Sequence, residues 1–363
     1  MEKKKYEKPG IEIRLVGVVL ILIMVLIEGA SFFGIWSLID AYWLRSAIAE
    51  VVMCLPILIY FIRCRGQFVA MMRLNPVKIR VILLAVLIEI CITPLAGLCN
   101  LITELFTPNT VNEVMGVYID TTPYGLMIIS MAIIPAIVEE IAMRGVVLSA
   151  FSRSGRKFAA ILFASACFGL IHGNINQFAY AFVVGTVMAL VVEAADSIFP
   201  SMAMHFFTNG FSITFMYILQ YSTITAEQAK GFMAQLGEET QEAEIVLPEE
   251  VVETIVNATM IITIAIVAAL AVGGLFAASK LIAKIAQISG RTEYMKSIKP
   301  KFGKRKKAAL EAGDSFAAAQ AGVNPVPELP KTRILNPALI VGMALWVGIM
   351  ILYELLVHGV IKL

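Results

Sequence analysis

Long apolar runs separated by short charged connections dominate this chain. The runs are about 20 residues long, which is the length that crosses the hydrocarbon core of a bilayer as an α-helix. The fifth run is short, and the segment HGNINQ at its end predicts a broken or re-entrant helix that lines a protein-enclosed cavity. We expect eight or nine spans, near 15–39, 46–64, 79–103, 124–151, 158–173, 176–195, 198–220, 254–280 and 334–360.

Composition supports an all-α, polytopic membrane bundle. The chain has 363 residues, of which 59% are hydrophobic and 15% charged, and its mean hydropathy is +0.83. A soluble domain is about 45–50% apolar and about 25% charged. The basic N-terminus precedes an apolar run longer than the core of a secretory signal, so we expect it to be retained as the first span.

Basic residues predict the orientation of the bundle. The N-terminus and the second, fourth and eighth connections are rich in Lys and Arg, whereas most connections between them are acidic or neutral. With nine spans the N-terminus is cytoplasmic and the C-terminus external, and with eight spans only the tail changes side. We expect an integral multi-pass membrane protein, and we expect its location to be a bacterial plasma membrane.

The same pattern predicts four regions. These are N-terminal transmembrane helices (1–120), core helices that carry polar side chains (121–220), an acidic external loop (221–253) and C-terminal transmembrane helices (254–363). The last region contains a basic cytoplasmic stretch, 286–333. We interpret this stretch as a flexible loop held near anionic headgroups, with a partner-docking segment as the alternative.

Ionisable side chains interrupt the fourth apolar run. Glu139, Glu140 and Arg144 lie there, and ionisable groups at membrane depth mark a functional site by default. Glu140 and Arg144 are four residues apart and can pair on one helix face. Glu139 is rotated by about 100° from Glu140 and faces elsewhere. The spacing thus predicts one glutamate neutralised by arginine and a second glutamate free for chemistry.

Two later runs carry a histidine each. Phe168 and His172 share a helix face, as do His205 and Asn209. The imidazole and the amide of His205 and Asn209 suit a developing oxyanion, which needs fixed donors in a water-poor cavity. Glu139 with His172 suits a general base that acts on water. The three runs together indicate buried acid–base chemistry.

The order E-E-x-x-x-R, then F-x-x-x-H, then H-x-x-x-N on successive spans resembles the CPBP family. This family contains the CAAX prenyl endopeptidases of the Rce1 type and bacterial relatives called Abi proteins. The resemblance covers residues 135–210. It implies an intramembrane endopeptidase that hydrolyses a peptide bond of a membrane-associated protein or peptide.

The resemblance also implies a role for each residue of the motifs. Glu139 and His172 would activate the attacking water, and His205 and Asn209 would stabilise the tetrahedral oxyanion. The supporting residues would be Glu140, Arg144 and Phe168.

The sequence does not decide whether the site binds a metal ion. Glu139, His172 and His205 could bind zinc as three ligands with an open position for water. The H-E-x-x-H motif of zinc proteases is absent, and Asn209 is a poor zinc ligand but a good oxyanion donor. The residues favour a site without a cofactor, with zinc as the alternative.

Two other functions compete with hydrolysis. A transporter could use the buried carboxylates as a proton relay, but the chain lacks the inverted repeats that many transporters show. A catalytically silent scaffold would be expected to have lost one of the polar motif residues, all of which are present. The expected partners are the lipid bilayer and a membrane-associated protein or peptide, and no motif indicates a nucleic acid.

Other ionisable residues in apolar runs have no apparent partner in the sequence. His358, near the end of the last run, is interpreted as a packing or hydrogen-bonding residue. The acidic residues left unassigned are Glu28, Glu50, Glu89 and Glu193.

Overall fold

The computed structural model describes a helical protein and confirms the all-α prediction. It describes residues 9–64, 72–109, 115–116, 118–235, 248–298 and 333–360, and within these residues there is no β-strand. The basic stretch 286–333 and the acidic loop 221–253 therefore lie partly outside the described residues.

The predicted apolar runs each correspond to a helix or a helical stack. The long helices are α1 (Pro9–Phe32), α2 (Tyr42–Cys64), α4 (Ile79–Thr103), α9 (Lys157–Leu170), α10 (Ile175–Ala195), α11 (Phe199–Gln235), α12 (Glu249–Ile288) and α15 (Pro337–Val357). The short ones are the 3-10 turn η1 (Ile35–Leu38) and α13 (Thr292–Lys296).

The fourth run is a stack of five short segments. In chain order they are α6 (Tyr124–Ile128), the π-helical η2 (Ile129–Ile133), α7 (Ile134–Glu140), the π-helical η3 (Ile141–Leu148) and α8 (Ser149–Ser152). Together they form one apolar span from Tyr124 to Ser152.

Seven of the described spans are long and apolar enough to cross a membrane. Helix α9 has only 14 residues, as its short apolar run predicted, and α11 is the other helix outside this set. The predicted count of eight or nine spans is therefore approximate.

Several helix boundaries differ from the sequence prediction. Helix α1 ends at Phe32 instead of 39, because Gly34 adopts a left-handed conformation with φ of 65° that an α-helix cannot continue through. Helices α11 and α12 are longer than predicted and include residues assigned to the acidic loop. At 1.5 Å per residue, the 40 residues of α12 extend about 60 Å, twice the hydrocarbon thickness of about 30 Å.

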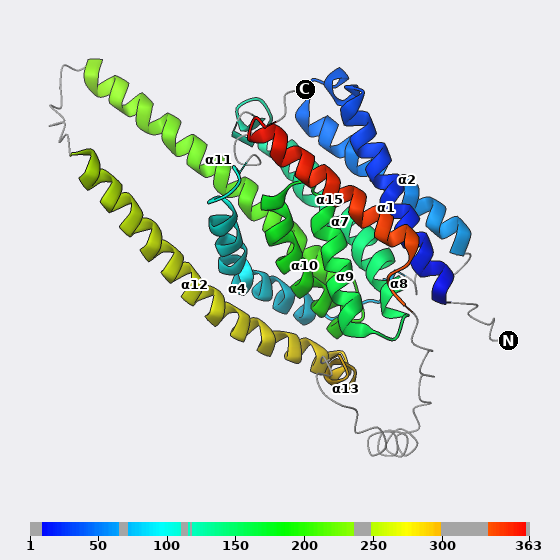
Figure 1. Ribbon diagram of the computed structural model, residues 1–363. Coiled ribbons are helices and arrows are strands. Elements are labelled where there is room, and N and C mark those ends of the chain that lie inside the picture. The colour runs from blue at the N-terminus through cyan, green and yellow to red at the C-terminus, as the bar shows by residue number, and fades with distance from the viewer. Residues whose placement is uncertain are drawn as a thin grey trace.

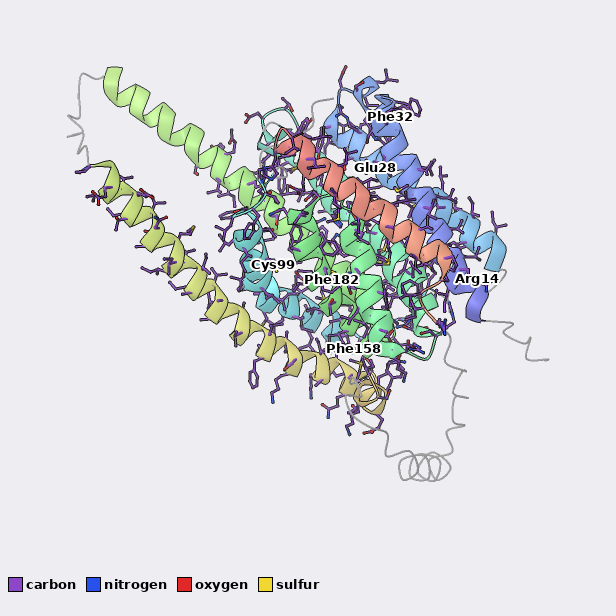
Figure 2. All side chains as sticks on the ribbon, viewed as in Figure 1. Arg14, Glu28, Phe32, Cys99, Phe158 and Phe182 are labelled. Atoms are coloured by element: carbon purple, nitrogen blue, oxygen red, sulfur yellow. The ribbon has the colours of Figure 1, made fainter. Side chains whose placement is uncertain are left out.

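The central helices are the most buried ones. Of the apolar segment of each helix, 61% is buried in α10 and 56% in the 124–152 span, but only 6% in α12. Figure 1 shows α9 and α10 among the other helices, with α11 and α12 extending away from them. In Figure 2 the side chains of α12 project outward along most of its length, as expected of a surface that faces lipid. The polar motifs thus lie where protein, not lipid, surrounds them.

Glu193, at the end of α10, holds several segments together. Its carboxylate accepts hydrogen bonds from Arg73 at 2.9 Å, Ser152 at 2.7 Å and Tyr294 at 2.6 Å. Burial and this carboxylate raise the pKa of the Tyr294 hydroxyl, which therefore stays a neutral donor. Arg291 binds the Glu193 carbonyl at 2.7 Å. Glu193 therefore has a structural role, since it fastens the start of the basic stretch to the bundle.

The backbones of helices α4 and α12 are in close contact at Gly274. A Cβ atom there would collide with the backbone carbonyl of Cys91, whereas a Cβ on the adjacent Gly273 would meet no atom within 4 Å. We expect Gly274→Ala to lower the stability of the detergent-solubilised protein by about 1–3 kcal/mol, because backbone atoms cannot move aside as a side chain can.

Gly273→Ala is the matched control for this prediction. It adds the same methyl group and the same helix propensity without the contact, so its melting temperature should equal or exceed that of the wild type. Equal melting temperatures for the two variants would show that α4 and α12 do not pack through Gly274.

Candidate functional site

Glu140 and Arg144 form a buried ion pair on the 124–152 span. Arg144 Nη1 lies 2.5 Å from Glu140 Oε1, and the two side chains are 2% and 0% exposed. The second guanidinium nitrogen is 3.4 Å from the carbonyl of Gly185 on α10. A buried charge is tolerated only when it is paired and hydrogen-bonded, and both conditions are met here. The predicted pairing at four-residue spacing is present in the structure.

Phe168 on α9 packs against the charged groups. The Arg144 guanidinium carbon lies 4.2 Å from the centre of the Phe168 ring, within the range of a cation–π interaction. The ring also makes edge contacts with His172 and His205, at centroid distances of 5.2 and 5.8 Å. Phe168 therefore fixes the relative positions of the arginine and both histidines.

The ring of His205 on α11 is oriented by Glu140. Its Nδ1 lies 3.1 Å from Glu140 Oε1, the oxygen that also binds Arg144. Because a carboxylate only accepts hydrogen bonds, Nδ1 of His205 carries the hydrogen. The other ring nitrogen, Nε2, is left for chemistry: it is an acceptor in the neutral ring and a donor in the charged one.

His172 is oriented in the same way by a backbone carbonyl. Its Nδ1 lies 2.8 Å from the carbonyl oxygen of Phe168, so Nδ1 is the protonated nitrogen and Nε2 is left as an acceptor. His172 follows the end of α9, in a turn whose Asn174 caps α10 by accepting from the Gln177 amide at 2.8 Å. The segment predicted as a broken helix is thus a tight turn between two helices.

Asn209 is held by a backbone carbonyl of the span that carries the two glutamates. Pro135 has no N–H, so it cannot donate to the Met131 carbonyl as an ordinary residue of an α-helix would. The Asn209 side chain donates to this carbonyl at 2.9 Å. One hydrogen of the amide group is therefore committed to fixing the side chain, and the second is left for a ligand.

Glu139 occupies a different environment from Glu140. The Glu139 side chain is 9% exposed and, among the described residues, forms no ion pair, whereas Glu140 binds Arg144. Its Oε2, like that of Glu140, has no hydrogen-bond partner among these residues. The titratable groups that interact with Glu139 include Glu50 of α2 and His205. The described structure contains no hydrogen bond between Glu139 and His172, which are instead both neighbours of His205.

Three of the unassigned acidic residues also lie near the site. Glu50 is within hydrogen-bonding reach of Glu139. Glu89 of α4 accepts a hydrogen bond of 2.6 Å from the hydroxyl of Thr208, the residue before Asn209 in the chain. Glu28, labelled on α1 in Figure 2, has a carboxylate oxygen 3.8 Å from where a Cβ on Gly173 would lie. The sequence indicates these residues as acids in apolar runs, but it does not indicate which side chains they contact.

His358 lies at the C-terminal end of α15, half-exposed and 3.7 Å from Glu354. Its position at a helix end agrees with the interpretation of this histidine as a residue outside the site.

The side chains proposed as zinc ligands do not form a ligand set. Within the described residues, no group of three or more His, Cys, Asp or Glu side chains is arranged to hold a metal ion. Glu139, His172 and His205 thus do not fit a three-ligand zinc site in this arrangement, and no step below involves a metal.

Part of the chain matches a known protein family. Residues 121–211 match the family model of Rce1-like, type II CAAX prenyl endopeptidases. The match contains every residue of the three motifs and confirms the resemblance to the CPBP family of intramembrane proteases. No curated protein and no solved structure matches the chain. The CPBP-like region runs from α6 to the first part of α11, whereas α2 and α4, which bring Glu50 and Glu89 to the site, lie outside it.

The ion pair provides a test of how the site is held together. We expect Arg144→Met to cost about 3–5 kcal/mol of stability, because it leaves the Glu140 carboxylate buried without its cation. Thermal unfolding in detergent would measure this loss.

The double variant Arg144→Met, Glu140→Gln serves as the control. It removes both charges, so it should be more stable than Arg144→Met alone. Additive losses from the two substitutions would mean that the pair has no coupling energy.

Proposed function

We propose that the protein is an intramembrane endopeptidase that hydrolyses a peptide bond of a membrane-associated protein or peptide. The observation that carries this proposal is the convergence of both histidines and the Glu140–Arg144 pair on Phe168, beside Glu139 and inside the matched endopeptidase region. We also propose a bacterial plasma membrane as the location and a cytoplasmic N-terminus, the latter because the basic connections indicate this orientation.

Glu139 is the proposed general base. Its Oε2 has no partner among the described residues, so it is available to accept a proton from water. His172 presents an acceptor nitrogen, since its Nδ1 hydrogen is held by the Phe168 carbonyl. A water that donates to both groups is positioned with a lone pair for the substrate carbonyl carbon, and Glu139 takes its proton as the new C–O bond forms.

His205 and Asn209 are the proposed oxyanion donors. To donate through Nε2, His205 must carry a second proton while its Nδ1 hydrogen remains bonded to the Glu140 carboxylate. Asn209 contributes the amide hydrogen that the Met131 carbonyl does not use. When the tetrahedral intermediate collapses, the C–N bond breaks and Glu139 returns its proton to the leaving amine.

A proton-relay transporter is the second candidate. It is favoured by the number of carboxyl groups near the site, since Glu50, Glu89, Glu139 and Glu140 come from three different elements. It would move protons without cleaving any peptide, and a catalytically silent scaffold would do neither.

Cleavage of membrane-tethered peptides tests the proposal directly. The protein in liposomes would be given a pooled library that includes prenylated and unmodified tails. We expect Glu139→Ala, His172→Ala and His205→Ala each to lower cleavage by at least about 10²-fold without unfolding the protein, because each removes a group that handles a proton or the oxyanion. His358→Ala should cleave like the wild type.

The same assay with a strong zinc chelator tests metal dependence. Cleavage that needs Glu139 and survives the chelator would support the metal-free mechanism. Loss of cleavage on chelation, restored by zinc, would contradict it. Damage by His358→Ala as large as by His172→Ala would show that the site is assigned to the wrong histidine.

Asn209 should act on the chemical step more than on binding. We expect Asn209→Ala to lower kcat by about 10²–10³-fold with little change in KM, because the lost hydrogen bond forms mainly to the oxyanion. Ser212→Ala is a suitable control, since this exposed serine on the same helix bonds only to the Thr208 carbonyl of its own helix. A rise in KM alone would assign Asn209 to substrate binding.

A further inference from the structure

Glu50 and Glu139 form a carboxyl pair across two helices. Helix α2 packs against α7 and η2, which brings the two side chains within hydrogen-bonding reach of each other. On each of them the oxygen Oε2 is buried and, among the described residues, has no hydrogen-bond partner. Two acidic side chains therefore meet at a site where no other group satisfies them fully.

Such a pair cannot carry two negative charges at low cost. Two carboxylates in contact repel strongly in a medium that excludes water, whereas one proton shared between them forms a charge-assisted hydrogen bond. Arg144, a cation that interacts with Glu139, is already bound to Glu140. The other titratable groups that face the pair are His205 on α11, Tyr180 on α10 and Cys54 on α2.

We infer that Glu50 is a positioning residue. It shares one proton with Glu139 and, through this hydrogen bond, holds the Glu139 carboxylate in position to act as the general base. In the resting site, Glu50 is protonated and donates a hydrogen bond to the Glu139 carboxylate. During hydrolysis Glu139 takes a proton from water and later gives it to the leaving amine, so the proton of Glu50 is not consumed. This inference rests on the proposed function and extends the site beyond the matched region 121–211.

A hydrogen-bond donor at position 50 should therefore matter more for cleavage than an acidic group. Glu50→Gln keeps a donor of the same size and should retain cleavage within about threefold. Glu50→Leu keeps the approximate volume but has no donor, so kcat should fall by about 10–100-fold, as for other residues that orient a catalytic group, with KM unchanged. In a Glu139→Ala background, Glu50→Leu should cause no further loss.

A second measurement does not depend on activity. Infrared spectra of the reconstituted full-length protein should contain a carboxylic acid C=O band that changes in both Glu50→Gln and Glu139→Gln, because the two residues share one proton. Glu89→Gln is the control: this buried acid is bound by Thr208, so its substitution should leave that band in place.

The two measurements separate failure of the inference from failure of the proposed function. Cleavage that depends on Glu139 but is unaffected by Glu50→Leu would overturn the inference and leave the protease proposal standing. Absence of any Glu139-dependent cleavage would count against the protease proposal, and the infrared spectra would then decide the inference. A band that changes in only one of the two variants, or in neither, would overturn proton sharing.

Discussion

The buried ion pair between Glu140 and Arg144 is the interaction on which the site depends. Arg144 neutralises one of two adjacent glutamates, and the neutralised carboxylate then orients the ring of His205. The guanidinium also packs on Phe168, whose ring edge sets the position of His172. A carboxylate at this depth is costly to keep ionised unless a cation or a hydrogen-bond donor stabilises it. The ion pair thus fixes both histidines: Glu140 binds His205 directly, and Arg144 packs on the Phe168 ring that contacts His172.

Departures from a regular helix position the remaining groups. Pro135 frees a carbonyl that holds the Asn209 amide, and π-helical segments lie on both sides of the short helix that carries the glutamates. Segments of this kind are frequent at functional sites, because the wider turn re-aims side chains while the helix continues. A regular helix would keep the Met131 carbonyl bonded within its own backbone and leave Asn209 without this anchor.

Sequence reasoning reaches those parts of the site that depend on local spacing. The Glu140–Arg144 pair follows from a separation of four residues, and the facing of Phe168 and His172 follows from the same rule. The contact between Glu140 and His205 joins residues 65 positions apart, and no local pattern encodes it. The length of helix α12 could not be predicted either, because the helix begins at Glu249, in the polar residues that precede its apolar run.

The residues that sequence patterns left unassigned show what tertiary packing adds. Glu50, Glu89 and Glu193 look alike in sequence, each an acid in an apolar run, yet their surroundings differ. Glu193 is held by Arg73, Ser152 and Tyr294, and such saturation leaves it only a structural role. Glu89 has one hydroxyl donor, and among the described residues the hydrogen-bonding group within reach of Glu50 is another acid, Glu139. The fewer fixed donors a buried carboxyl has, the more its state depends on a proton, and proton transfer is the chemistry that peptide hydrolysis needs.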